Sequence, residues 1–159
     1  MKHKKVLISS IVVCIVLVLA AVMLLYLCNQ QPNISEEDIK EGEQAVQEEL
    51  LRMSNEKYTL SFSIKEVLYS ETATKNVQNF YATGFLAQEY TQNNASLKEN
   101  LIAIYVNYEC EYDHTLTPNE DGDIQCYIFV LRDLSTGKWN VWDRSYDLKK
   151  FGKSGSSDK

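Results

Sequence analysis

Few side chains in this sequence are of a type that could carry out a reaction. The chain has two histidines, His3 and His114, and His114 follows Asp113 directly. A histidine beside a carboxylate suits acid–base catalysis. However, Asp113 and His114 lie at the end of a segment with strand character. Neighbouring residues on a strand point to opposite faces, so these two side chains would not act together. We therefore interpret His114 as a residue that shapes a turn, and we predict no catalytic residue.

An acidic loop is the nearest approach to a metal site. Glu120, Asp121 and Asp123 lie close together, but calcium takes about six or more oxygen ligands, usually spread over a longer loop. Zinc would need a local group of histidines and cysteines, which the loop lacks. We see no glycine-rich phosphate loop and no Ser/His/Asp arrangement. The sequence therefore predicts no metal and no cofactor.

Two cysteines, Cys110 and Cys126, fall on two segments that read as the strands of a hairpin. A hairpin symmetric about residue 118 would place them opposite each other, and would pair Tyr108 with Ile128 and Val106 with Val130. Opposite residues in an antiparallel pair lie close enough for a disulfide. The alternative is two buried thiols, since free cysteine is among the most buried residue types.

Aromatic side chains are concentrated in the same segments. Five of them form a candidate ligand or partner face: Tyr105, Tyr127, Phe129, Trp139 and Trp142. Aromatic residues line pockets and anchor interfaces. They also fill protein cores, and for most of these residues we expect core packing.

An apolar run near the N-terminus predicts a membrane anchor. Residues 6–28 carry no charge, and a helix of that length would span the roughly 30 Å hydrocarbon core of a bilayer. Lysines precede the run and acidic residues follow it, which keeps the N-terminal flank in the cytoplasm. We expect a cytoplasmic tail over residues 1–5, an anchor over 6–28 and the remainder outside the cytoplasm, at the cell membrane.

Two other interpretations of this run remain open. A cleaved signal peptide would need small residues after its apolar core. Ala20 and Ala21 meet that need, but the apolar run continues past them. A lipoprotein signal would be cut before Cys28, where Leu27 stands in place of a small residue.

The charge balance excludes one class of partner. The chain has 16 basic and 22 acidic residues and a net charge of −6, and three of the lysines precede the apolar run. The part beyond the anchor is therefore more acidic still, which argues against binding nucleic acid.

Residues 29–34 read as a short linker, followed by a domain over 35–150 and a flexible tail over 151–159. Ser35 and the acidic residues after it predict the start of a helix that ends near Ser54. Apolar residues alternate from Tyr58, and their parity changes beyond Glu66, which predicts a strand with a bulge. Residues 74–90 fit a helix only moderately, because Gly84 weakens the pattern.

Three further strands are predicted over residues 101–113, 123–132 and 138–146, with turns at 119–122 and 135–137. The elements together indicate an α+β domain. Both faces of the first of these strands are apolar, so neither should face water. We expect the helices on one face. A partner, a second copy, a small molecule or the curling of the sheet over itself would cover the other.

Three sequence runs resemble a family. They are Y-E-C-E-Y-D-H-T over residues 108–115, E-D-G-D over 120–123 and K-W-N-V-W-D over 138–143. They resemble small membrane-anchored extracytoplasmic domains of Gram-positive, clostridial-type bacteria, which are similar to the SnoaL-like, nuclear-transport-factor-like α+β cone superfamily. The resemblance implies a curved antiparallel sheet packed on N-terminal helices, preceded by one transmembrane helix. It implies no particular activity, because that superfamily includes enzymes, ligand binders and scaffolds.

These features lead us to expect a non-catalytic, membrane-tethered domain that binds a protein partner or a small ligand outside the cytoplasm. Self-association is included in that expectation. A structural subunit of a secretion or conjugation complex is the alternative. An isomerase or hydrolase of the SnoaL type ranks below both, and would need an acid such as Asp143 directed into a pocket.

Overall fold

The computed structural model describes residues 18–19, 22–23 and 34–152. The chain separates into two compact units, Met1–Gln31 and Pro32–Lys159, and the description below concerns the second. The anchor predicted over residues 6–28 lies outside the described residues except at four positions. Among the residues that are described, no helix has both the length and the apolar character needed to cross a bilayer.

Helix α2 (Glu36–Ser54) begins and ends where the sequence predicts. The Ser35 hydroxyl accepts a hydrogen bond from the Asp38 amide, and the Asp38 carboxylate accepts one from the Ser35 amide. This capping box satisfies two of the free amide groups at the helix N-terminus. Val46 and Leu50 face the core. Gly42 is buried as well, and a Cβ there would lie 2.3 Å from Cδ1 of Ile102, so α2 lies close against the sheet.

Four antiparallel strands form one open sheet in the order β1–β2–β3–β4. Their bounds are Thr59–Tyr69 for β1, Leu101–Tyr112 for β2, Gly122–Arg132 for β3 and Trp139–Ser145 for β4. The predicted bulge in β1 is confirmed, since the register shifts between Ile64 and Glu66. A second bulge, in β4, was not predicted: Val141 and Asp143 pair with successive residues of β3, which leaves Trp142 as the extra residue.

The segment between β1 and β2 forms three short helices: α3 (Glu71–Tyr81), α4 (Phe85–Gln92) and α5 (Leu97–Asn100). The moderate helical pattern over residues 74–90 therefore covers two helices that meet at Gly84, the N-cap of α4. A last short helix, α6 (Leu148–Phe151), follows β4.

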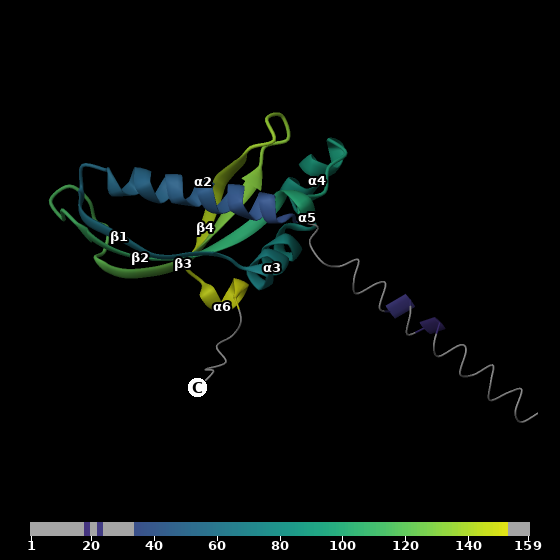
Figure 1. The fold of residues 1–159 in the computed structure, drawn as a ribbon, viewed down its shortest axis with the longest axis horizontal. Coiled ribbons are helices and arrows are strands. Elements are labelled where there is room, and N and C mark those ends of the chain that lie inside the picture. The colour runs from purple at the N-terminus through teal and green to yellow at the C-terminus, as the bar shows by residue number, and fades with distance from the viewer. Residues whose placement is uncertain (1–17, 20–21, 24–33, 153–159) are drawn as a thin grey trace, which may run out of the picture. The chain divides into compact units, whose positions relative to one another are not determined.

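Helices of the chain itself cover both faces of the sheet (Figure 1). Helix α2 packs on the face that carries Ile102, Ile104 and Val106. On the other face, Leu101 and Ala103 pack in a second core with residues of α3 to α6. The prediction that the helices would share one face is therefore wrong. The segment between β1 and β2, which was hardest to assign, covers these apolar residues of the second face together with α6.

Of the tail predicted over residues 151–159, only Phe151 and Gly152 are among the described residues, and at Phe151 the prediction is wrong. Phe151 is only 3% exposed and belongs to the second core. Its ring centroid lies 5.0 Å from that of Phe129, and its carbonyl accepts a hydrogen bond from the Asn76 side chain. The Gly and Ser residues just beyond it concealed this last apolar contact.

The register of the β2–β3 hairpin differs from the prediction. Cys110 lies opposite Gly122 and Cys126 opposite Val106, four positions along the ladder. That separation is roughly 13 Å, whereas bridged Cα atoms lie about 6 Å apart. Both cysteines are buried free thiols, which agrees with the second of the two interpretations and not with the disulfide.

The physical reason for this difference is the start of the turn. Asp113 begins to reverse the chain, since its side chain accepts from the Thr115 amide and its carbonyl from the Leu116 amide. Asp121 closes the loop by accepting from the Tyr112 amide at 2.8 Å. The hairpin is therefore wider than a tight turn over residues 119–122.

Candidate functional site

The five aromatic residues predicted to form a ligand or partner face do not form one surface. Phe129 and Tyr127 are buried in the second core, and Tyr105 packs against them. Trp139 is buried on the opposite face, under α2. Only Trp142 is well exposed, at 40%. Core packing therefore explains four of the five, and Trp142 is the one that can meet a partner.

Trp142 borders a cleft of about 640 Å³ between α4 and the β3–β4 hairpin, which we call the β4 cleft. Its walls combine α4, the end of β3, the hairpin and the first half of β4. They are lined by Glu89, Tyr90, Asn93, Leu131, Arg132, Asp133, Leu134, Ser135, Asn140, Val141 and Trp142. Apolar, polar and charged side chains thus meet in one hollow, which is the usual composition of a binding cleft.

The bulge in β4 brings Trp142 to this position. An extra residue in a strand re-aims the side chains around it. The indole packs edge-on against Tyr81 of α3, with centroids 4.9 Å apart and planes at 73°. One side of the ring is therefore supported while the side chain stays accessible. A supported, half-exposed tryptophan is typical of an interface anchor.

Polar contacts hold the walls of the β4 cleft in place. The Tyr90 hydroxyl donates to the carbonyl of Arg132, and burial raises the pKa of Tyr90 to about 12, so the phenol stays a neutral donor. In the hairpin, Asp133 accepts from the Ser135 hydroxyl and from the amides of Thr136 and Ser135. These bonds lower the pKa of Asp133 to about 2.

Arg132 connects the β4 cleft to helix α2. Its guanidinium pairs with Asp38 and lies 4.6 Å from the ring centroid of Trp139. Nε of Arg132 and Nε1 of Trp139 are buried and have no hydrogen-bond partner among the described residues. Unpaired buried donors are uncommon in native proteins. Arg132 lines the cleft, whereas Trp139 lies in the core under α2.

A second hollow, of about 490 Å³, lies between the end of α2 and the far part of the sheet. Four tyrosines and two arginines dominate its lining, so we call it the tyrosine cleft: Tyr58, Tyr108, Tyr112, Tyr146, Arg52 and Arg144. Burial is the main reason that the pKa of Tyr108 and of Tyr112 is raised. Both phenols are neutral at physiological pH.

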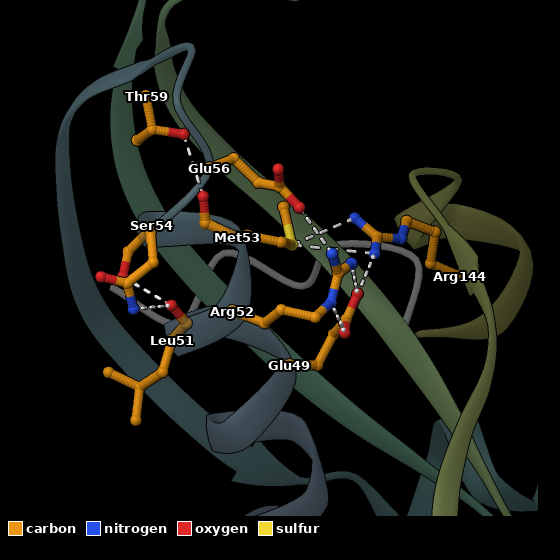
Figure 2. Close-up of polar contacts among 9 residues, drawn as sticks. Glu49, Leu51, Arg52, Met53, Ser54, Glu56, Thr59 and Arg144 are labelled. Atoms are coloured by element: carbon orange, nitrogen blue, oxygen red, sulfur yellow. Dashed lines mark hydrogen bonds and ion pairs between the residues drawn. The ribbon is translucent and has the colours of Figure 1, made fainter.

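Figure 2 shows how Glu49 of α2 lies between the two arginines of the tyrosine cleft. Arg52 donates to Glu49 through Nε and Nη2, both at 2.8 Å, and this is the largest cause of the lowered pKa of Glu49. Arg144 of β4 reaches the same carboxylate at 3.4 Å, and Sδ of Met53 at 3.7 and 3.8 Å. Glu49 is thus bound mainly by Arg52.

The residues considered for acid–base or metal chemistry are dispersed. His114 pairs with Asp121 across the loop, at 2.9 Å, and not with Asp113. Asp123 pairs with Lys65 of β1, while Glu120 lines the tyrosine cleft. Over residues 34–152, no group of three His, Cys, Asp or Glu side chains could hold a metal ion. Asp143 is exposed, and its carboxylate accepts from the Arg144 amide.

The partners of the two arginines that join the sheet to α2 could not be inferred from the sequence. Arg132 pairs with Asp38 near the start of the helix, and Arg144 pairs with Glu49 near its end. Each pair joins residues distant in sequence, and no local pattern signals it. The one available signal was that basic residues in predicted strands need an acidic partner, and α2 is rich in acidic residues.

Comparisons of the chain with protein-family models, with curated proteins and with solved structures give no match. The structure therefore shows the fold class but no family. The chain forms an α+β domain in which an N-terminal helix packs on an open, four-stranded antiparallel sheet.

Proposed function

We propose that this chain is a membrane-tethered, non-catalytic domain that binds a protein partner outside the cytoplasm through the β4 cleft. The observation that carries this proposal is the position of Trp142. It is 40% exposed, supported by Tyr81, and placed on the rim of a hollow that runs along an edge strand. The acidic composition of the chain is consistent with a protein partner and unfavourable for nucleic acid.

An extended segment of the partner fits this cleft. β4 is the last strand of the sheet, so one side of its backbone has no neighbouring strand. Peptides commonly bind such an edge by adding a strand, with main-chain hydrogen bonds for affinity and side-chain pockets for specificity. Asn140, Val141 and Trp142 of β4 line the cleft together, so a paired segment would lie directly against the indole.

The anchor belongs to the same proposal. The uncharged run over residues 6–28 and the lysines before it favour a single span with the N-terminus in the cytoplasm. The described domain begins at Ile34, so only a few residues separate it from that span. A partner at the same membrane would therefore meet the β4 cleft at high local concentration.

The cone superfamily is the finer fold assignment that we propose. It is supported by the sequence runs over residues 108–115, 120–123 and 138–143, and by the antiparallel sheet packed on α2. A solved structure of the domain that superimposes on no member of that superfamily would remove this part of the proposal.

Photo-crosslinking in intact membranes tests partner binding. A photoreactive residue at Leu134, which is 41% exposed and lines the β4 cleft, should form a crosslink to a second protein. The matched control is Leu116, which is 53% exposed on the other hairpin and lines neither cleft. Trp142→Ala should remove the Leu134 crosslink while the melting temperature of the domain falls by only a few degrees.

The mass of the product distinguishes the outcomes. A heterologous product that depends on Trp142 supports the proposal. A product of twice the chain mass would favour the structural-subunit alternative, in which the chain assembles with itself. Equal crosslinking from Leu134 and Leu116, or a Leu134 product unaffected by Trp142→Ala, would overturn the role of the β4 cleft.

A further inference from the structure

The tyrosine cleft lies apart from the β4 cleft, and the two share no lining residue. Its volume of about 490 Å³ is within the range of pockets for small molecules. The mixture of phenol rings, apolar side chains and guanidinium groups in its walls raises the question of which ligand would suit it.

Arg144 is the group in this cleft with unused capacity. A guanidinium has five N–H donors and no acceptor. Burial acts to lower the pKa of the Arg144 guanidinium, but a hydrogen bond with Tyr146 raises it. The other contacts of Arg144 are a carboxylate oxygen of Glu49 at 3.4 Å and a thioether sulfur at 3.7 and 3.8 Å. The first is long for a charged hydrogen bond, which normally measures about 2.8 Å, and the second is to a weak acceptor.

Glu49 is held mainly by Arg52, which donates to both of its oxygens at 2.8 Å, and its contact with Arg144 is the longer one at 3.4 Å. The side chain of Arg144 is only 29% exposed, so water reaches it only in part. A partly buried guanidinium whose one carboxylate contact is long, and which has five N–H donors, is suited to a planar, two-oxygen anion. Arginine binds carboxylates in that way, through two parallel N–H···O bonds.

The side chains around Arg144 determine which chemical group can carry the anion. Tyr108 and Tyr112 are largely buried, Tyr146 is exposed, and Ile124 adds an aliphatic surface. Aromatic walls favour a flat ring, which packs edge-on or offset against them. Neutral phenol hydroxyls can donate further hydrogen bonds to an oxygen of the ligand.

We propose that the tyrosine cleft binds a small carboxylate that carries a ring, with the carboxylate on Arg144 and the ring among the tyrosines. Two carboxylates limit the affinity because their negative charge repels the ligand: Glu49, at 3.4 Å from Arg144, and Glu120, an exposed residue at the same cleft. Ligand binding in the tyrosine cleft does not depend on partner binding at the β4 cleft. Either proposal can therefore be wrong while the other is right.

Ligand-observed NMR on the full-length chain in detergent micelles tests the proposal with benzoate as the probe. We expect saturation transfer to benzoate at concentrations up to about 10 mM, and binding of the neutral isostere benzamide that is about tenfold weaker or less. Arg144→Gln should weaken benzoate binding by about tenfold, and Arg144→Lys should recover part of it, because lysine keeps the charge but not the fork.

Two further variants keep the test decisive if the Arg144 variants fold poorly. Glu120→Gln should tighten benzoate binding a few-fold, since it removes the repelling charge from an exposed position. Lys138→Gln removes one positive charge from an exposed residue that lines neither cleft, and should change nothing.

Equal binding of benzoate and benzamide, or benzoate binding that Glu120→Gln leaves unchanged, would overturn the proposal. So would a parent chain that binds no benzoate at about 10 mM. None of these outcomes bears on the crosslink from Leu134.

Discussion

Two arginines join helix α2 to the sheet, one near each end of the helix. Arg132 pairs with Asp38 close to the N-cap, and Arg144 meets Glu49 three turns later. All four side chains are less than one third exposed, at 28%, 19%, 29% and 19%. Ion pairs at such positions fix the orientation of packed elements more reliably than they add stability, since desolvation offsets much of the attraction. Both candidate clefts adjoin one of these pairs.

Cys110 and Cys126 should both react as free thiols once the protein is unfolded. The hairpin register separates them, and burial raises the pKa of the Cys126 thiol to about 11, so it is neutral and unreactive in the folded state. Alkylation with a maleimide, with and without denaturant and without any reductant, followed by peptide mapping, measures this. Protection of either cysteine that only a reductant removes would contradict the observed register.

His114 should titrate above its ordinary range. Its hydrogen bond to Asp121 is the main cause of the raised pKa, and the same bond is the main cause of the lowered pKa of Asp121. Because the pKa of His114 is raised, its bond to Asp121 stabilises the loop fully at pH values below the unfolded-chain histidine pKa of about 6.5. That contribution is lost as the pH rises through the pKa of the folded state. The lowered pKa of Asp121 stabilises the loop at pH values above the unfolded-chain pKa of aspartate. That contribution is lost as the pH falls through the folded-state pKa of Asp121.

The C2–H proton resonance of His114 measures this titration directly, because His3 is the only other histidine. Asp121→Asn should return the pKa of His114 toward 6.5, while Asp113→Asn should have a much smaller effect. A larger effect of Asp113→Asn would mean that the neighbouring carboxylate, and not the one across the loop, is the partner of His114.

At the scale of the elements, helix α2 depends on the absence of a side chain at Gly42. A Cβ at this position would lie 2.3 Å from Cδ1 of Ile102, which is itself fully buried. Gly42→Leu should therefore destabilise the domain by about 1–3 kcal/mol, the usual cost of overpacking a core. Glu41→Leu, on the exposed side of the same helix, is the control.

Urea denaturation followed by circular dichroism measures both variants. The midpoint should fall for Gly42→Leu and stay close to that of the parent chain for Glu41→Leu. If both variants unfold at the parent midpoint, α2 does not lie as close to β2 as Gly42 indicates.

Elements with a local signal were predictable. Ser35 and Asp38 mark the start of α2, and the parity change after Glu66 marks the bulge of β1. Two other features were not. The β2–β3 register follows from Asp113 starting the turn early, and the second core follows from α3 packing on the far face of β2 and α6 on that of β3. The second core depends on contacts between residues distant in sequence, whereas the register depends on a local turn at Asp113 that the sequence analysis placed too late.

The same distinction applies to the candidate sites. Trp142 was predicted as a partner residue and is exposed, but its four companions serve the two cores. Strand alternation would have separated Trp139 from Trp142, yet only the bulge decides which way Trp142 points. The tyrosine cleft was not predicted at all, because it joins residues of α2, β2, the following loop, β3 and β4.

At the scale of the whole molecule, the orientation across the membrane is the prediction with the widest consequences. If the lysines before residue 6 hold the N-terminus in the cytoplasm, the β3–β4 hairpin lies outside. Ser135 is an exposed residue of that hairpin, so Ser135→Cys should react with a membrane-impermeant maleimide on intact cells. The parent chain is the matched background, and both it and the variant should carry Cys28→Ser, because Cys28 lies at the outer end of the predicted anchor. Cys110 and Cys126 are buried.

The labelling result decides more than the topology. Reaction of Ser135→Cys on intact cells, with no more than background labelling of the parent chain, would place both clefts where extracellular proteins and small carboxylates can reach them. Reaction only after permeabilisation would place the domain in the cytoplasm. The partner of the β4 cleft and the ligand of the tyrosine cleft would then have to be cytoplasmic, and the buried thiols would need no protection from an oxidising compartment.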